Sequence, residues 1–334
     1  MKIIVDNKIP FIKGRLEAVA EVVYADPDAF TPELVKDADA LIVRTRTRCD
    51  ATLLAESAVS LVVTATIGTD HIDIPWCESR GITVENAAGC NAPGVAQYVW
   101  SAILRNGFDP SRHTLGLVGK GNIGSIVADW GRRLGAKVIV SDPPRAARGL
   151  TDENYLPLDE LLREADAVTL HTPLTHAGPD ATYHLISSPQ LDLMKPGALL
   201  INAARGEVVQ NTALLHWIEA GRGRAVLDVW EGEPHLDRNL LGAVIYATPH
   251  IAGYSREGKE RATRMALEAV ERRFGVALDK SGLEGAYLPP VKAISPETIV
   301  ESYDPAADTA MLRSRPEAFE ELRGAYRYRP EVAF

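Results

Sequence analysis

The chain has 334 residues, of which 46% are apolar and 24% charged, so it is long enough for two globular domains and unlike a disordered protein. A formal net charge of -9 argues against general nucleic-acid binding, and no apolar stretch approaches the ~20 residues that a membrane span needs. The first residues enter a strand-like run and lack the longer apolar region of a secretory signal. We therefore expect a cytoplasmic protein with neither a membrane nor a nucleic acid as partner.

The number and spacing of the cysteines also favour a cytoplasmic protein. Only three cysteines occur, widely spaced at Cys49, Cys77 and Cys90. This spacing is typical of a reducing compartment and predicts neither a disulfide framework nor a metal site.

Short apolar runs alternate with helix-like segments along the first 90 residues. We expect buried parallel strands, each separated by about one helix's worth of chain, at 2–6, 21–25, 39–44, 60–66 and 81–86. Residues 1–91 are therefore predicted to form one small α/β domain, the substrate-binding domain, which the charged helix at 255–275 completes.

A second set of strands follows a predicted helix at 92–107. The expected strands are 113–119, 136–142, 166–173, 197–204, 224–230 and 243–250. Six strands with helices between them favour a doubly wound sheet at residues 92–254. The predicted fold is α/β, with two Rossmann-like or flavodoxin-like doubly wound domains, a cleft between them and a short C-terminal extension.

The last part of the chain is weakly patterned. From residue 278 to 334 it is Pro-rich, with a hinge-like entrance at 287–296, and it is too short for a large core of its own. Two interpretations stay open: the segment covers the interface of a homodimer, or it is a poorly packed end.

A glycine loop gives the strongest local motif. Residues 119–124 read GKGNIG between a predicted strand and a predicted helix, and Asp142 ends the next strand. The first glycine permits a tight turn, the second lets backbone N–H groups approach a pyrophosphate, and the third allows close helix packing. The predicted cofactor residues are Gly119, Gly121, Asn122, Ile123, Gly124 and Asp142.

The identity of the dinucleotide follows from the acid at the end of that strand. The carboxylate of Asp142 favours NAD, because it can accept hydrogen bonds from ribose hydroxyls and would repel a 2'-phosphate. Arg145 and Arg148 leave NADP open, since nearby arginines can bind that phosphate. A methyltransferase-like nucleotide site is a weaker alternative.

Three later strand ends carry the groups that oxidation of a hydroxy acid needs. Arg205 can bind a carboxylate, His250 can accept the hydroxyl proton, and Glu233 can orient the base. Spacing alone does not show that they meet. Taken singly, His250 can be a structural histidine and Glu233 a solvated loop acid.

The stretch from residue 171 to 234, followed by TPHIAGYS at 248–255, resembles the D-isomer-specific 2-hydroxyacid dehydrogenases. The motifs IVDNKIPF, VRTRT, TATIGTDHID and SDPPRAARG are similar to the branch of this family that oxidises a four-carbon hydroxy acid carrying a phosphate. The similarity runs from residue 1 to about 275 and continues more loosely through the tail.

The resemblance implies a role for each residue. Arg205 would bind the C1 carboxylate and the reacting oxygen, His250 would take the C2 hydroxyl proton, and Glu233 would raise the basicity of His250. Hydride would pass to the nicotinamide. Further positions that match the family are Thr172, Asp228 and Gly253 beside the cofactor, and Thr45, Thr66 and Tyr254 beside the substrate.

Three arginines alternate from the last residue of the third predicted strand onward, at positions 44, 46 and 48. A phosphorylated acid needs a cation for its second anionic end, and an arginine suits a phosphate because it binds in a bidentate, charge-assisted manner. We expect Arg44, which matches a family arginine, to bind it; Arg46 is the second candidate, and Arg48 should meet solvent.

The chain departs from the family pattern at a few places. Gln97 stands where the interdomain helix often has Glu, Gln210 where Asp is common, and the tail is shorter than expected for a dimerisation segment. The alternatives are another dehydrogenase of the family, for 3-phosphoglycerate or an unphosphorylated acid, and an NAD-sensing scaffold that does not turn over. His171 is expected to shape the cofactor strand and His71 to serve a turn.

Overall fold

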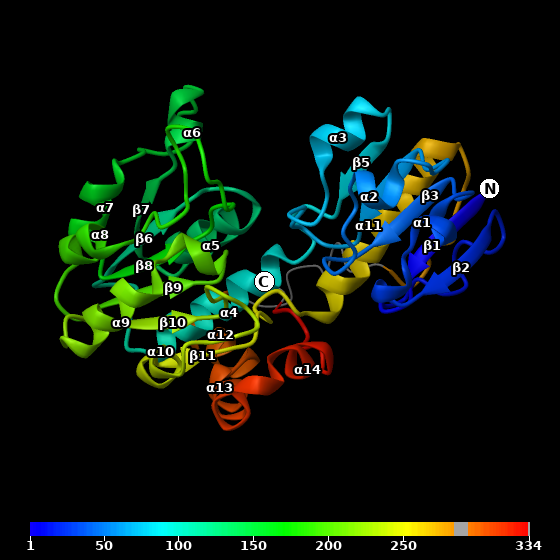
Figure 1. The fold of residues 1–334 in the computed structure, drawn as a ribbon. Helices are drawn as coiled ribbons and strands as arrows, with labels where there is room; N and C mark the ends of the chain where they lie inside the picture. The colour runs from blue at the N-terminus through cyan, green and yellow to red at the C-terminus, as the bar shows by residue number, and fades with distance from the viewer. Residues whose placement is uncertain (284–292, 333–334) are drawn as a thin grey trace. The chain divides into compact units, whose positions relative to one another are not determined.

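The structure is a computed structural model, and it describes residues 1–283 and 293–332. Most of the hinge-like entrance predicted at 287–296 lies outside the described residues. The chain divides into two compact units (Figure 1): unit 1 is Met1–Asn91 with Ser255–Leu288, and unit 2 is Ala92–Tyr254 with Pro289–Phe334.

Unit 1 is built on a parallel sheet of order β2-β1-β3-β4-β5. The strands are β1 (Lys2–Asp6), β2 (Glu21–Ala25), β3 (Ala40–Val43), β4 (Leu61–Thr64) and β5 (Thr83–Asn86). The helical elements are η1 (Pro27–Ala29), α1 (Pro32–Val35), α2 (Ala51–Leu54), α3 (Ile74–Ser79) and α11 (Arg256–Phe274). The predicted strands are confirmed.

The predicted helix between the first two strands is wrong. Residues 7–20 form turns instead, because Pro10 lacks a backbone donor and Phe11 and Gly14 take positive φ angles of 61° and 83°. Helix α11 does form, between the Ser255 side chain that accepts from the Gly258 N–H and a left-handed Gly275.

Unit 2 is built on a parallel sheet of order β11-β10-β9-β8-β6-β7. The strands are β6 (Thr114–Val118), β7 (Lys137–Ser141), β8 (Ala167–Leu170), β9 (Ala198–Asn202), β10 (Gly223–Leu227) and β11 (Tyr246–Ala247). The helical elements are α4 (Ala92–Arg105), α5 (Asn122–Arg133), α6 (Pro143–Ala147), α7 (Leu158–Glu164), α8 (Ser188–Leu193), η2 (Gly206–Val208), α9 (Asn211–Glu219) and α10 (Arg238–Ala243). Because β6 lies between β7 and β8, the strand order reverses beside it, and such a point is where open α/β sheets bind ligands.

The C-terminal segment belongs to unit 2. It forms α12 (Pro296–Ser302), α13 (Pro305–Ser314), η3 (Pro316–Ala318) and α14 (Phe319–Gly324). Ile299 and Tyr303 are buried in the core that contains α4, while Leu312 and Phe319 are buried in the second core of unit 2. The interpretation of a poorly packed end is therefore wrong for these helices.

Burial elsewhere agrees with the sequence. Trp100, Trp130 and Trp217 lie on helices and are all buried. Within residues 1–283 and 293–332, the structure contains no helix that combines the length and the apolar character required to cross a bilayer.

Candidate active site

The glycine loop adopts the strand–turn–helix form that the motif predicts. Gly119 follows β6 with a φ of 88°, where an L side chain is strained, and a Cβ there would lie 2.8 Å from the carbonyl oxygen of His171. A Cβ at Gly124 would lie 2.2 Å from the carbonyl oxygen of Gly119. Both positions therefore require glycine for internal packing.

Gly121 differs from its neighbours. Among the residues that the structure describes, no atom lies within 4 Å of the position of a Cβ there, and no side chain caps the N-terminus of α5, whose first residue, Asn122, is exposed. Ile123, the next residue, is half-buried. The open space and the uncapped N–H groups fit a pyrophosphate, which needs both a close backbone approach and unsatisfied donors.

Asp142 lies directly after β7 and faces this loop. One of its carboxylate oxygens accepts the Lys120 N–H at 2.7 Å, and the other accepts the Arg145 N–H at 3.0 Å. Each carboxylate oxygen has a second lone pair, so both can still accept a ribose hydroxyl.

The cations around Asp142 are bound to a neighbouring acidic segment. The Lys120 ammonium lies 2.7 Å from both Asp152 and Glu153, while the Arg145 guanidinium donates to Asp152 and to the Tyr155 hydroxyl, each at 3.0 Å. The ammonium of Lys120 and the hydroxyl of Tyr155 hold the pKa of Asp152 well below its usual range, so this carboxylate is charged at neutral pH. The acidic segment therefore pairs with the Lys120 ammonium and the Arg145 guanidinium, which could otherwise bind the 2'-phosphate of NADP.

Thr172 and His171 border the same loop after β8. The Thr172 hydroxyl is buried and, among the described residues, has no hydrogen-bond partner, while its methyl lies 3.1 Å from the position of a Cβ at Gly119. An unpaired buried hydroxyl is costly unless a ligand satisfies it. Burial lowers the pKa of His171 to about 3, so its ring is neutral and helps to shape the loop.

The predicted base and its acidic partner meet. Glu233 Oε2 lies 2.9 Å from His250 Nδ1, and Glu233 Oε1 accepts the N–H of Trp230 at 2.9 Å. Burial raises the pKa of Glu233, but the hydrogen bond and charge of His250, with the Trp230 N–H, outweigh it and leave that pKa below its usual value. Glu233 is thus held as a carboxylate that fixes the Nδ1 side of the ring and leaves Nε2 for chemistry.

The segment around His250, residues 248–254, is the His250 loop. His250 itself has a φ of 57°, which is uncommon for a residue with a side chain, and its N–H donates to the carbonyl of Asp228 at 2.8 Å. The fully buried Asp228 carboxylate accepts from the Thr248 hydroxyl and from the N–H groups of Ile251 and Ala252 at 2.6 to 2.9 Å. Asp228 therefore organises the loop that ends at Gly253 and Tyr254.

Arg205 follows β9, beside the strands that lead to the other two residues. Its guanidinium donates to the Ala204 carbonyl at 2.8 Å, and the fully buried Asn202 side chain donates to the Arg205 carbonyl at 2.8 Å. Because β9, β10 and β11 are parallel neighbours, Arg205, Glu233 and His250 all follow strands at the same edge of the sheet.

In unit 1, Arg44 follows β3 and is already paired. Its Nε lies 3.0 Å from Oδ2 of the fully buried Asp6, at the end of β1. The guanidinium has four further N–H donors, so this pair orients Arg44 without using all of its capacity. Thr66 shares a 2.6 Å hydrogen bond with Thr64, whereas Thr45 is exposed.

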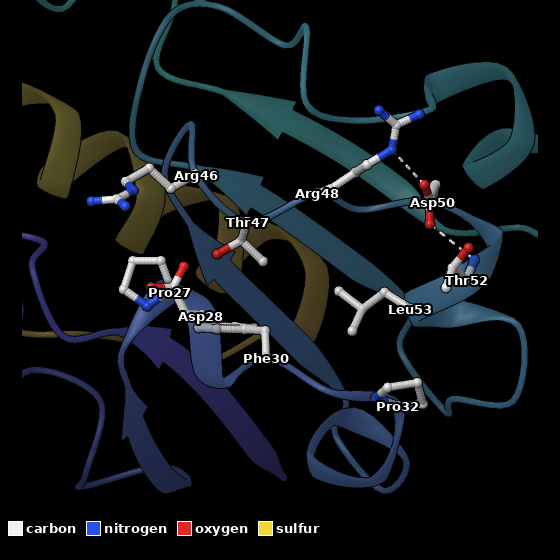
Figure 2. Close-up of a pocket in the computed structure, with 10 residues that line it drawn as sticks. All are labelled: Pro27, Asp28, Phe30, Pro32, Arg46, Thr47, Arg48, Asp50, Thr52 and Leu53. Atoms are coloured by element: carbon white, nitrogen blue, oxygen red, sulfur yellow. Dashed lines mark hydrogen bonds and ion pairs between the residues drawn. The ribbon is translucent and has the colours of Figure 1, made fainter. Parts of the chain in front are cut away.

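Arg46 and Arg48 line a pocket of about 510 Å³ in unit 1 (Figure 2). Arg48 is largely exposed, as expected, but its Nε lies 2.6 Å from Asp50, and Asp28 supplies a second carboxylate to the lining. The lining thus contains two arginines and two aspartates, and the pocket carries no net positive charge. Arg44 is not among its lining residues.

Some site residues escaped the sequence analysis. Asp6 and Asn202 are fully buried polar residues at the last position of a buried strand. A polar residue at the end of an apolar run is visible in the sequence, and it could have identified both residues as candidates for the site. The residues of the C-terminal tail that contact the His250 loop gave no such signal.

Comparison with known proteins places the chain in a family. The NAD-binding domain model of the D-isomer specific 2-hydroxyacid dehydrogenases matches residues 93–252. The chain is 47% identical to the erythronate-4-phosphate dehydrogenase of Bacteroides fragilis over 341 aligned positions, which cover 99% of this chain and 97% of the relative.

Solved structures give the same fold. The D-lactate dehydrogenase of Aquifex aeolicus, complexed with NAD and lactic acid, superposes with a TM-score of 0.68 at 27% identity, covering 82% of this chain and 96% of that one. The NAD-bound 3-phosphoglycerate dehydrogenase of Entamoeba histolytica superposes with a TM-score of 0.69 at 26% identity, covering 83% and 96%. Both similarities bear out a fold of two parallel-sheet α/β domains.

Proposed function

Since the chain belongs to the erythronate-4-phosphate dehydrogenases, within the D-isomer-specific 2-hydroxyacid dehydrogenase family, we propose that Arg205, Glu233 and His250 carry its reaction. The protein is an NAD-dependent dehydrogenase that oxidises 4-phospho-D-erythronate to 2-oxo-3-hydroxy-4-phosphobutanoate. Its product would serve the synthesis of pyridoxal 5'-phosphate. The reaction removes a hydride from C2 and a proton from the C2 hydroxyl.

The Glu233–His250 pair carries this proposal. Because the Glu233 carboxylate binds Nδ1 at 2.9 Å, Nδ1 is the nitrogen that carries the proton whenever the ring of His250 is neutral, and the lone pair is then on Nε2. Nε2 would accept the hydroxyl proton, and the carboxylate would stabilise the imidazolium that forms. The two residues therefore act as a base and the partner that orients it.

Arg205 is proposed to bind the C1 carboxylate and the C2 oxygen, because a planar guanidinium can donate to both at once. Arg44 is proposed to bind the phosphate, with Arg46 as the second candidate and Thr45, Thr66 and Tyr254 as further substrate contacts. Arg44 is favoured because Asp6 orients its guanidinium while leaving donors for an anion.

The glycine loop fits NAD on three observations: the open space at Gly121, the uncapped start of α5 and the unpaired Thr172 hydroxyl. Bound NAD would supply the acceptor for the hydride that leaves C2. The proposed cofactor residues are those of the glycine loop, Asp142 for the ribose, and Thr172, Asp228 and Gly253 as further residues that line the cofactor. Arg145 and Lys120 are both paired with Asp152, so they are not available to bind the 2'-phosphate of NADP, and this supports NAD as the cofactor.

The proposal also covers setting and assembly. Within the described residues the buried Cys49, Cys77 and Cys90 form no disulfide, which supports a cytoplasmic setting. The tail is shorter than expected for a dimerisation segment but is folded, and it is proposed to contribute to a homodimer.

The experiment offers 4-phosphoerythronate, 3-phosphoglycerate and erythronate to the purified protein with NAD and follows the 2-oxo product by mass spectrometry. An added 2-oxo acid acceptor allows turnover if NADH stays bound. We expect selective turnover of 4-phosphoerythronate, lost in His250→Ala with NAD binding intact. A preference for another acid would refute the substrate, near-normal kcat in His250→Ala would refute the base, and no turnover at all would favour the NAD-sensing scaffold.

A further inference from the structure

Arg329, in the C-terminal tail, is buried to all but 7% of its surface and uses every donor that it has. Its NH1 donates to the Ile251 carbonyl at 3.1 Å and to the Tyr326 hydroxyl at 3.3 Å. Its NH2 donates to the carbonyls of Gly94, at 2.9 Å, and Ala252. With the bond from Nε to Gln97, these contacts account for all five guanidinium N–H groups.

Two of these acceptors belong to the His250 loop. Asp228 binds the N–H groups of Ile251 and Ala252, and Arg329 binds the carbonyl groups of the same two residues. In the backbone directly after His250, the N–H groups are thus bound by the Asp228 carboxylate and the carbonyl groups by the Arg329 guanidinium. A residue with an uncommon positive φ, such as His250, depends on neighbours fixed in this way.

Gln97 explains how the arginine is held in place. Its side-chain oxygen accepts from Arg329 Nε at 3.3 Å, and its side-chain nitrogen donates to the Pro330 carbonyl at 3.2 Å. A glutamate at this position would keep the acceptor and lose the donor. Glutamine in place of the family's glutamate at residue 97 therefore allows α4 to bind two residues of the tail, Arg329 and Pro330.

The same part of the tail also surrounds Tyr254, the last residue of the His250 loop. The rings of Tyr326 and Tyr328 each lie 6.2 Å from the Tyr254 ring, and the Arg323 guanidinium lies 6.0 Å from its centre. Arg323 comes from α14 and Arg329 from the segment that follows it. The tail therefore contacts the backbone of the His250 loop at Ile251 and Ala252 and the side chain of its last residue, Tyr254.

We propose that Arg329 is a positioning residue for the reaction: it fixes the His250 loop by binding the carbonyls of Ile251 and Ala252, and thereby keeps His250 aligned with Glu233 and with substrate. The inference rests on the proposed role of His250 as the base. It assigns the C-terminal tail a part in turnover that is separate from any part in assembly.

The chain offers a matched control for tail docking. Arg313, on α13, also donates to two backbone carbonyls of unit 2, those of Leu241 and Val244, but neither belongs to the His250 loop. Arg313→Met and Arg329→Met each remove one tail arginine that binds carbonyl groups. Only the second should affect the alignment of His250.

The experiment measures kcat, the KM for 4-phosphoerythronate, NAD affinity and Tm for both variants. A small misplacement of a catalytic group costs up to ~100-fold in rate, so we expect kcat of Arg329→Met to fall by about 10- to 100-fold while KM changes by less than about threefold. Arg313→Met should lower Tm and keep its kcat. Arg329→Lys, which keeps a cation with three donors, should recover part of the lost kcat.

Hydrogen exchange gives a readout independent of activity. The amides of Ile251 and Ala252 should exchange faster in Arg329→Met and Arg329→Lys than in Arg313→Met. If Arg329→Met does not fold, Arg329→Lys carries the same comparison. Normal kcat and normal exchange in Arg329→Met, or an equal loss of kcat in Arg313→Met, would overturn the inference. Failure of the base assignment is recognised separately, because His250→Ala would then retain turnover.

Discussion

Gly121, the N-cap of α5, and Gly124, in the first turn of that helix, are three residues apart, yet only Gly124 is closely packed against other atoms. A Cβ at Gly124 would lie 2.2 Å from the Gly119 carbonyl oxygen, whereas a Cβ at Gly121 would meet nothing within 4 Å. One glycine is thus required by the fold, and the other leaves space that the proposed pyrophosphate would fill.

Alanine substitutions should separate these two requirements. Gly124→Ala should destabilise the protein by about 1–3 kcal/mol or more, as overpacking does. Gly121→Ala should keep its Tm and weaken NAD binding by at least about tenfold, since each 1.4 kcal/mol of lost contact is tenfold in affinity. Thermal unfolding and titration with NAD measure both, and unchanged NAD affinity in Gly121→Ala would contradict the proposed position of the pyrophosphate.

Arg44→Ala has two expected effects, because Arg44 is paired with a buried carboxylate. Loss of the phosphate contact, worth about 1.5–3 kcal/mol for a charge-assisted bond, should raise the KM for 4-phosphoerythronate about 10- to 100-fold without changing NAD affinity. Loss of the partner of Asp6 should lower the free energy of unfolding by about 3–5 kcal/mol.

A double variant distinguishes these effects. Arg44→Ala with Asp6→Asn removes the stranded charge, so it should recover stability and keep the raised KM. Arg48→Ala, which removes a largely exposed arginine, is the control and should alter neither quantity. A normal KM in the double variant would show that Arg44 serves only the Asp6 pair.

Cofactor choice should respond to Asp152, although the predicted NAD determinant is Asp142. Asp152→Ala removes one carboxylate contact from Arg145, which keeps its bond to Tyr155, and one from Lys120. The released donors can bind a 2'-phosphate, so the KM for NADP should fall by about tenfold, the size of one charge-assisted bond. Steady-state kinetics with both cofactors would measure this. As a control, Glu164→Ala breaks the exposed pair with Lys137 elsewhere in unit 2 and should leave the KM for NADP unchanged. An equal KM for NADP in the two variants would contradict the role of Asp152 in cofactor choice.

His171 should make stability depend on pH. Burial lowers its pKa from about 6.5 to about 3, so between these values the unfolded chain binds a proton that the folded chain does not. Its contribution is complete above pH 6.5 and is lost as pH falls, with a slope of at most ~1.4 kcal/mol per pH unit. Urea unfolding of His171→Gln from pH 7 to 4 should give a flatter dependence than the wild type. His216→Gln, at an exposed helix position, should give the wild-type slope.

The sequence by itself determined the structural features that depend on residues close together along the chain. The glycine loop needs one strand, one turn and one helix, all within residues 114–133, and their periodicity and glycines are readable directly. The strands of both sheets are short apolar runs, and they were predicted for the same reason. Even the candidate base and its partner were found, because polar residues that follow buried parallel strands share one edge of a sheet.

Only the tertiary structure decided which polar groups are already occupied. The pairing of Arg44 with Asp6, of Arg145 with Asp152, and of Arg329 with the His250 loop joins side chains by direction and distance, which no local pattern encodes. Arg329 lies 78 positions beyond Ile251, in a tail whose weak periodicity gave no sign of where it packs. The amphipathic pattern of a segment specifies that one face must be buried, but the surface that buries it is chosen by the shape of the completed sheet and its helices.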